Sequence, residues 1–282
     1  LHRGERARLH DERGVGAELI EVFREQGVIT TLVTAGRAFE ATGTRSYTID
    51  PANPEHFRRL WTAVGGDGKD RPRVVHLWNL DTPGDSSMDT MTLDSAVECG
   101  ISAVVHMVQA LVGAGVSHRA LWIVTQAAMS VDSAGRALTA RHVTFAQAPV
   151  WGLGRTIALE HPDLWGGLID VAHEDPRSAA RVLARELMSA TDEDQVALTN
   201  DGRYVARLVR RGRAAMVNEP PNLRSDATYL VTVGVGALGL HVPQWLGPFG
   251  PRPSLRTRPH SALDVSLRTP ICPLGGRRAG SP

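Results

Sequence analysis

The chain has 282 residues, of which 42% are hydrophobic, and this is enough apolar sequence for one large core or two modest ones. Its 31 basic and 30 acidic residues give a formal net charge of +1, so the charge balance predicts neither a nucleic acid nor a membrane as partner. The cysteines, Cys99 and Cys272, are too few for a disulfide framework and too isolated for a zinc site. Without a leader or a run of about 18 apolar residues, we expect a soluble cytoplasmic protein.

From Gly14 to about Val209 helical and strand patterns alternate, which predicts a βα-type domain with a largely parallel sheet. We expect strands at 28–34, 45–50, 73–80, 120–126 and 166–171, helices at 16–27, 53–64, 92–115, 146–161 and 176–190, and a hairpin at 194–210 turning at Asn200, Asp201 and Gly202. In the helix before Pro162, Val150, Leu153, Ile157 and Ala158 share one face.

A polar stretch with paired prolines, 212–225, is interpreted as a linker. After it, "TYLVTV" predicts a new strand and "GVGALGLHVPQWL" a new helix. Residues 247–282 are rich in Pro, Arg and Gly, so we expect a disordered tail in which no second strand follows.

A glycine motif follows the "TYLVTV" strand. Gly234, Gly236 and Gly239 form G-x-G-x-x-G between an apolar strand and an apolar helix pattern, which is the context of a dinucleotide-binding turn. Glycines there let the backbone turn sharply and approach the cofactor phosphates at the helix N-terminus. The competing interpretation is an ordinary tight βα turn, and Pro243 in the second turn of the helix favours it.

Several segments together resemble the ketoreductase region of modular type I polyketide synthases. These are "VVHLWNLD", "LWIVTQAA", "QAPVWGLGRTIALEHPDLWGGLIDV", "DGRYVARLVR" and "TYLVTVGVGALGLHV", in the family's order over about Asp11 to Leu246. The resemblance implies a truncated Rossmann-like structural subdomain at 11–211, a linker at 212–225, the opening βα unit of an NADPH-binding catalytic subdomain at 226–246, and the tail at 247–282. The fold class is therefore α/β, a Rossmann-like parallel sheet followed by an incomplete second Rossmann βα unit.

The resemblance also implies a function. The family's intact enzyme reduces a carrier-bound β-ketoacyl thioester to a β-hydroxyacyl thioester with NADPH. It implies as partners an acyl carrier domain, the other synthase domains and a catalytic ketoreductase subdomain, with no nucleic acid and no membrane. The cofactor-binding residues that match are Thr232, Gly234, Gly236, Leu238 and Gly239.

The sequence departs from the family at three places. Val233 stands where a glycine is usual, Pro243 where Ala or Arg is commoner, and "LHRGERARLH" where an apolar first strand is usual, so that strand is expected to be lost or altered. Catalysis in this family requires a Tyr four residues before a Lys, because the Lys lowers the pKa of the Tyr proton donor. The tyrosines are Tyr47, Tyr204 and Tyr229, and the single lysine is Lys69, so no such pair exists and no catalytic residue is assigned.

Other motifs are given structural interpretations. "LDSAVE" at 93–98 resembles a phosphopantetheine site faintly, but Asp94 or Ser95 is more simply a helix cap. "GVGAEL" at 14–19 lacks a third glycine and is expected to bind no nucleotide. His76, His106 and His118 have no metal-ligand spacing, and Trp151 and Trp165 are interpreted as packing anchors.

The sequence thus predicts a truncated ketoreductase that is inactive alone, with a frame change near Leu246 as one origin of the tail. Two alternatives stay open: a non-enzymatic scaffold that packs against a catalytic partner, and a simple NADPH-binding module that uses the Gly234–Gly239 turn.

Overall fold

The computed structural model describes residues 6–9, 11, 14–64, 72–82, 88–131, 144–189, 191–208, 210, 228–232, 241 and 254–258. The chain divides into two compact units, which we call the first unit (Leu1–Leu208) and the second unit (Val209–Pro282).

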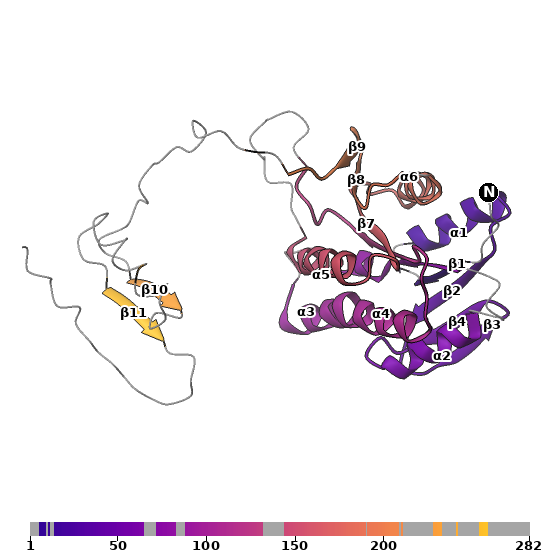
Figure 1. The fold of residues 1–282 in the computed structure, drawn as a ribbon, viewed down its shortest axis with the longest axis horizontal. Coiled ribbons are helices and arrows are strands. Elements are labelled where there is room, and N and C mark those ends of the chain that lie inside the picture. Colours follow the sequence, from indigo (N-terminus) through magenta and orange to yellow (C-terminus); the bar gives the residue numbers. More distant parts are fainter. Residues whose placement is uncertain are drawn as a thin grey trace, which may run out of the picture. The chain divides into compact units, whose positions relative to one another are not determined.

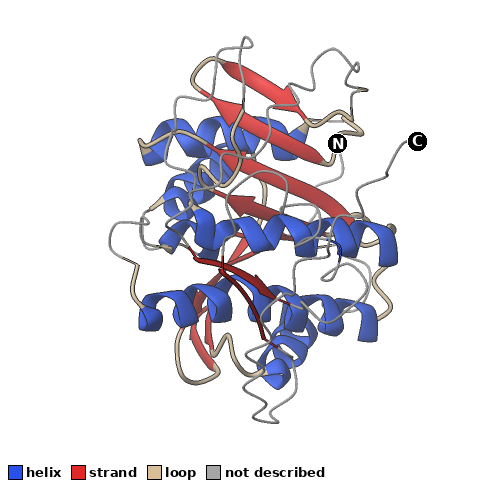
Figure 2. Ribbon diagram, turned by 90° about the vertical axis from the view of Figure 1, so that its left-hand side faces the viewer, coloured by secondary structure: helices blue, strands red, loops and turns tan. Residues whose placement is uncertain are grey.

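The first unit is built on one mixed sheet, seen in Figures 1 and 2. Its strand order is β3-β4-β2-β1-β5-β6-β7-β8-β9. All neighbouring strands are parallel except the two edge strands, β3 and β9, which run antiparallel to β4 and β8. The strands are β1 (Arg6–Leu9), β2 (Thr30–Ala35), β3 (Glu40–Gly43), β4 (Ser46–Ile49), β5 (Arg73–His76), β6 (Leu121–Thr125), β7 (Trp165–Val171), β8 (Gln195–Thr199) and β9 (Gly202–Val205).

Helices cover both faces of this sheet. On one side α1 (Val15–Glu25) packs against α6 (Pro176–Met188), and on the other lie α2 (Pro54–Val64), α4 (Ala103–Gly113) and α5 (Ala148–Glu160) (Figure 1). The order β4-β2-β1-β5-β6-β7 is that of a dinucleotide-binding Rossmann sheet, 3-2-1-4-5-6 in the order of its own strands. The predicted fold class is confirmed.

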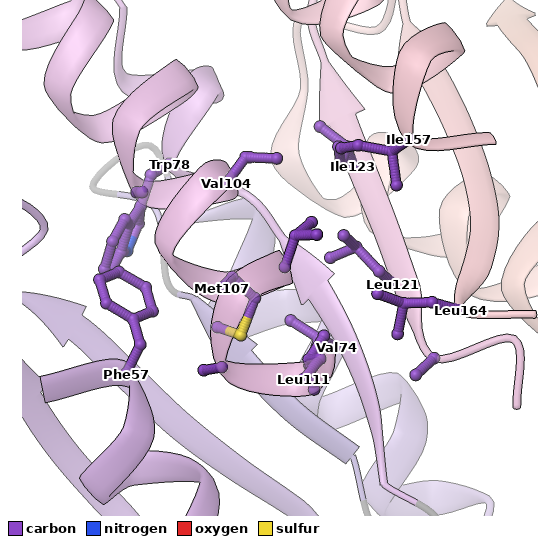
Figure 3. Packing of buried hydrophobic residues seen from close by; sticks show 14 of the residues in the cluster. Phe57, Val74, Trp78, Val104, Met107, Leu111, Leu121, Ile123, Ile157 and Leu164 are labelled. Carbon is purple, nitrogen blue, oxygen red and sulfur yellow. The ribbon is translucent and has the colours of Figure 1, made fainter. Parts of the chain in front are cut away.

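The central strands are buried along their whole length. Every residue of β6 and β7 is buried, which is the pattern of parallel strands covered on both faces. One core lies between the sheet and α2, α4 and α5, where Phe57, Trp78, Met107, Leu111 and Leu121 interlock (Figure 3). The other core lies under α1 and α6.

Helix α5 lies unusually close to β7. Of its predicted apolar face, Val150 and Ile157 are buried, while Leu153 and Ala158 are half-buried. Gly154 permits the approach, because a Cβ at that position would lie 2.8 Å from Cδ1 of Leu168. Gly152 in the same helix has open space around it.

The predicted helix at 92–115 is continuous but not uniform. It consists of α3 (Thr90–Val97), a π-helical turn at Glu98–Ser102, and α4. Among the described residues, Thr90–Gly113 alone has a length and hydropathy that would suffice to cross a membrane, and 39% of its most apolar window is buried inside the fold. Its buried side chains belong to α4 and pack in the core described above.

Two expectations for the first unit were wrong in detail, and one strand was missed. Arg6–Leu9 does form a strand, β1, at the centre of the sheet, because backbone pairing with β2 and β5 does not require apolar side chains. The strand expected at 73–80 ends at His76, and a 3-10 turn at Trp78–Asp81 follows it. A short apolar run does not distinguish a strand from such a turn. The short exposed edge strand β3 was not predicted.

The second unit contains two described strands. β10 (Thr228–Thr232) pairs in parallel with β11 (Ser254–Arg258), from Thr228↔Ser254 to Thr232↔Arg258. The expectation that no strand follows Leu246 was therefore wrong. That expectation rested on the Pro-, Arg- and Gly-rich composition of the tail. Its Ser-Leu-Arg-Thr-Arg segment can nevertheless pair through its backbone like any other.

Candidate functional site at the carboxyl ends of the strands

The predicted cofactor turn begins where β10 ends. Thr232 is the last residue of β10, whereas Gly234, Gly236, Leu238 and Gly239 lie outside the described residues. A parallel pair joined by a connection as long as 233–253 is the geometry of a crossover unit. The structure therefore places the strand of this predicted site but not its glycines.

In the first unit the corresponding position lies between β1 and β5, where the strand order reverses. Rossmann-type sheets bind ligands outside the carboxyl ends of the strands at this point. The turn from β1 to α1 contains Gly14, whose φ of 90° is in the left-handed region that glycine favours.

A carboxylate already occupies the start of α1. Asp11 is fully buried, and its Oδ2 accepts a hydrogen bond from Val15 N at 3.1 Å and its Oδ1 one from Gly16 N at 2.5 Å. These two N–H groups belong to the first turn of α1, where backbone donors have no partner within the helix. Gly14 is thus the N-cap of α1, and the Asp11 side chain, three residues earlier, bonds to the first N–H groups of the helix.

A second buried carboxylate lies at the ends of β6 and β7. Asp170 accepts hydrogen bonds from Thr125 Oγ1 (2.6 Å), Ala128 N (2.9 Å) and Met129 N (3.1 Å). Burial raises the pKa of Asp170, while the bonds from Thr125, Ala128 and Met129 act in the opposite direction. Trp151 Nε1 donates to the same Thr125 oxygen at 3.0 Å, so α5 is tied into the network.

A neutral histidine lies at the end of β5. Burial lowers the pKa of His76 to about 3, and the nearby backbone of Cys99 offsets part of that effect. Its Nε2 makes no hydrogen bond within the described residues, and its Nδ1 lies 3.3 Å from Asn79 Nδ2. Asn79 Nδ2 also donates to Val124 O at 3.2 Å, which joins the 3-10 turn after β5 to β6.

Among the described residues at this edge, both buried carboxylates therefore accept hydrogen bonds from neighbouring groups of the fold. Of the tyrosines in this unit, Tyr47 lies on β4 and Tyr204 on β9, while Lys69 lies outside the described residues. Nowhere in the described part of the chain do three His, Cys, Asp or Glu side chains gather in a way that could hold a metal ion.

The remaining sequence candidates have structural roles. Asp94 and Ser95 lie inside α3, and the cap is Asp89, whose side chain accepts from Thr92 N at 2.8 Å; the expected cap was thus wrong by one turn. His106 Nδ1 lies 3.0 Å from Pro51 O and His118 Nε2 lies 3.1 Å from Pro72 O, so both bond to backbone. The interpretation of the two tryptophans as packing anchors is confirmed, since Trp151 and Trp165 are buried in one core cluster.

Sequence reasoning missed Asp11, Asp170 and Asn79. Asp11 had no readable signal, because it lies three residues before the N-cap Gly14 and the strand before it was expected to be lost or altered. Asp170 had none, because its partners on β6 and the following loop are more than 40 residues away in the sequence.

Residues 28–208 match the family described as "Polyketide synthase extender module SpnB, Rossmann fold domain". Polyketide synthase GfsA of Streptomyces halstedii is 36% identical over 223 residues, which is 79% of this chain and 3% of that protein. Pikromycin polyketide synthase component PikAII of Streptomyces venezuelae is 46% identical over 134 residues, 47% of this chain and 3% of that protein. The chain thus spans a small part of the relatives that it matches.

Solved structures resemble it in fold. An A-type ketoreductase from a modular polyketide synthase aligns over 88% of this chain and 47% of its own, with a TM-score of 0.59 and 26% identity. The first ketoreductase of the tylosin polyketide synthase aligns over 87% of this chain and 47% of its own, with a TM-score of 0.62 and 23% identity. The chain covers about half of each of these structures.

Proposed function

The chain belongs to the Rossmann-fold domain family of polyketide synthase extender modules, and from this premise we propose that it is the structural half of a ketoreductase, a scaffold without reductase activity of its own. In the larger protein it supports NADPH-dependent reduction of a carrier-bound β-ketoacyl thioester to a β-hydroxyacyl thioester. We place it in the cytoplasm, beside an acyl carrier domain and other synthase domains.

One observation carries the scaffold proposal. Among the described residues at the carboxyl ends of the first unit's strands, Asp11 accepts two N–H groups at the start of α1, and Asp170 is bonded to Thr125 and Ala128. A buried carboxylate with its acceptors occupied is an inert part of the fold rather than a group free to bind a ligand.

The proposed catalytic partner is the ketoreductase subdomain whose opening strand and turn would be 226–246. The cofactor turn in that subdomain would use Thr232, Gly234, Gly236, Leu238 and Gly239. The boundary between the compact units at Leu208 supports a structural subdomain that ends near Arg211. In this proposal a linker at 212–225 and a tail at 247–282, which contains β11, follow it.

A specific observation favours a second candidate function, a simple NADPH-binding module. Adjacent parallel strands such as β10 and β11 are how the first half of a dinucleotide site begins. The two candidates differ in whether this chain alone binds NADPH.

Calorimetric titration of the purified chain with NADPH, with NADH as comparison, separates them. We expect no saturable binding in the micromolar range, because Val233 replaces a glycine of the turn and Pro243 interrupts its helix. The matched control is Gly236→Val, which closes the turn to a phosphate. Saturable NADPH binding that this substitution abolishes would establish the module and contradict the scaffold.

A further inference from the structure

A hollow with a volume of about 330 Å³ opens on the outer side of α2, which lies beside β4 and β3 (Figure 1). Its α2 lining consists of exposed residues three and four positions apart, which share one helix face: Glu55, Arg58, Arg59, Thr62 and Ala63. The opposite face of the helix is buried in the core. The hollow has the size of a small-molecule site, for which about 300 Å³ is the lower end of the usual range.

The remaining lining residue, Phe39, comes from the loop before β3 and is held by aromatic neighbours. Its ring centroid lies 6.0 Å from that of Tyr47 on β4 and 5.9 Å from that of His56 on α2. The guanidinium carbon of Arg59 lies 4.1 Å from the centroid of the Phe39 ring. The ring therefore fixes the guanidinium at the wall of the hollow by a cation–π contact.

The two arginines of the hollow differ in their partners. Arg58 Nη1 forms an ion pair with Glu55 Oε2, so these two charges compensate each other. Arg59 forms no hydrogen bond or ion pair within the described part of the chain. A cation–π contact uses none of the N–H donors of a guanidinium, so those of Arg59 remain available to an acceptor. The lining thus carries one uncompensated positive charge beside apolar surface.

We propose that this hollow binds a small carboxylic acid. Its carboxylate accepts hydrogen bonds from the Arg59 guanidinium, whose planar fork matches two carboxylate oxygens. The apolar part of the acid packs against Phe39 and the methyl group of Ala63. A monoanion balances the single free charge of the lining. The site is independent of the scaffold proposal, because it lies on the outer side of α2 and takes no part in ketone reduction.

A competing explanation is that Arg59 only shields the half-buried Phe39 ring from water. In that case the guanidinium adds to packing, and the hollow has no preference for an anion. The two explanations differ in whether a carboxylate binds here more tightly than a neutral molecule of the same shape.

The experiment is an NMR titration of the full ¹⁵N-labelled chain with benzoate, at constant ionic strength, with benzamide as the uncharged comparison. Benzoate should shift the amide signals of α2 saturably, with a Kd of about 1 mM, as expected for a ligand of this size with one charged contact. Benzamide should bind at least about tenfold more weakly. Benzoate that binds no more tightly than benzamide, or that causes no saturable shift in α2, would overturn the proposal.

Two variants locate the charge that is responsible. Arg59→Gln removes the free guanidinium from an exposed position and should raise the Kd for benzoate about tenfold. Arg24→Gln is the matched control, because it removes the same charge from an exposed position on α1, where Arg24 pairs with Glu21. It should leave the Kd unchanged. An unchanged Kd in Arg59→Gln, or an equal rise in both variants, would show that benzoate does not bind in this hollow through Arg59.

Discussion

Lowering the pH from about 7 to about 4 should reduce the unfolding free energy of the first unit by about 3 kcal/mol through His76 alone. Burial holds the pKa of His76 at about 3, against 6.5 for a free histidine. Between these values the unfolded chain binds a proton that the folded chain does not, so stability falls as the pH falls. The imidazole at the end of β5 thus makes the fold sensitive to acid.

Urea unfolding of the wild type and of His76→Gln at several pH values isolates this effect. Glutamine has a similar volume and does not titrate, so the stability difference between the two proteins should shift by about 3 kcal/mol over this range. Asp170 acts with the opposite sign, because its raised pKa makes stability fall as the pH rises, and it is common to both proteins. Equal pH slopes in the two proteins would refute the prediction.

Replacing Asp170 by alanine should cost about 3 kcal/mol of unfolding free energy, because the Thr125 hydroxyl and the Ala128 and Met129 N–H groups lose their acceptor. The loss is partly offset, since burial of the carboxylate is itself unfavourable, as its raised pKa indicates. The effect is measured by chemical unfolding at neutral pH.

Two comparisons show whether the cost belongs to the buried network. Asp170→Asn keeps the size and one acceptor oxygen, so its loss should lie between those of the wild type and the alanine variant. Asp175→Ala removes an exposed cap and should cost clearly less unfolding free energy than Asp170→Ala. If Asp170→Ala were no less stable than Asp175→Ala, the network would not hold the carboxyl edge together.

The sequence predicted the helices and strands in which apolar residues recur at a regular spacing. The buried runs that became β6 and β7 and the helices around Phe57 and Leu183 lie where their apolar spacing placed them. The strands β1 and β11 were not predicted, because backbone hydrogen bonds between strands leave no mark in the amino-acid composition. Such strands are visible only once their neighbours are in place.

The candidate site, too, could be predicted from the sequence only in part. The glycine turn that begins after Thr232 is a local motif and could be proposed from sequence. The groups of the buried network come together only through the order of the strands, as with Asp170 and Thr125, which lie on β7 and β6. Sequence alone therefore suggested where a cofactor would bind, while the structure showed which groups the buried carboxylates Asp11 and Asp170 bind.

The central claim is that this chain supports a ketoreductase but does not reduce ketones itself. The most direct test is NADPH consumption with a β-ketoacyl thioester surrogate, by the purified chain alone and after mixing with a separately produced catalytic half of a related ketoreductase. The account predicts no reduction by the chain alone and NADPH-dependent formation of the β-hydroxyacyl thioester in the mixture. Saturable reduction by the chain alone would contradict it.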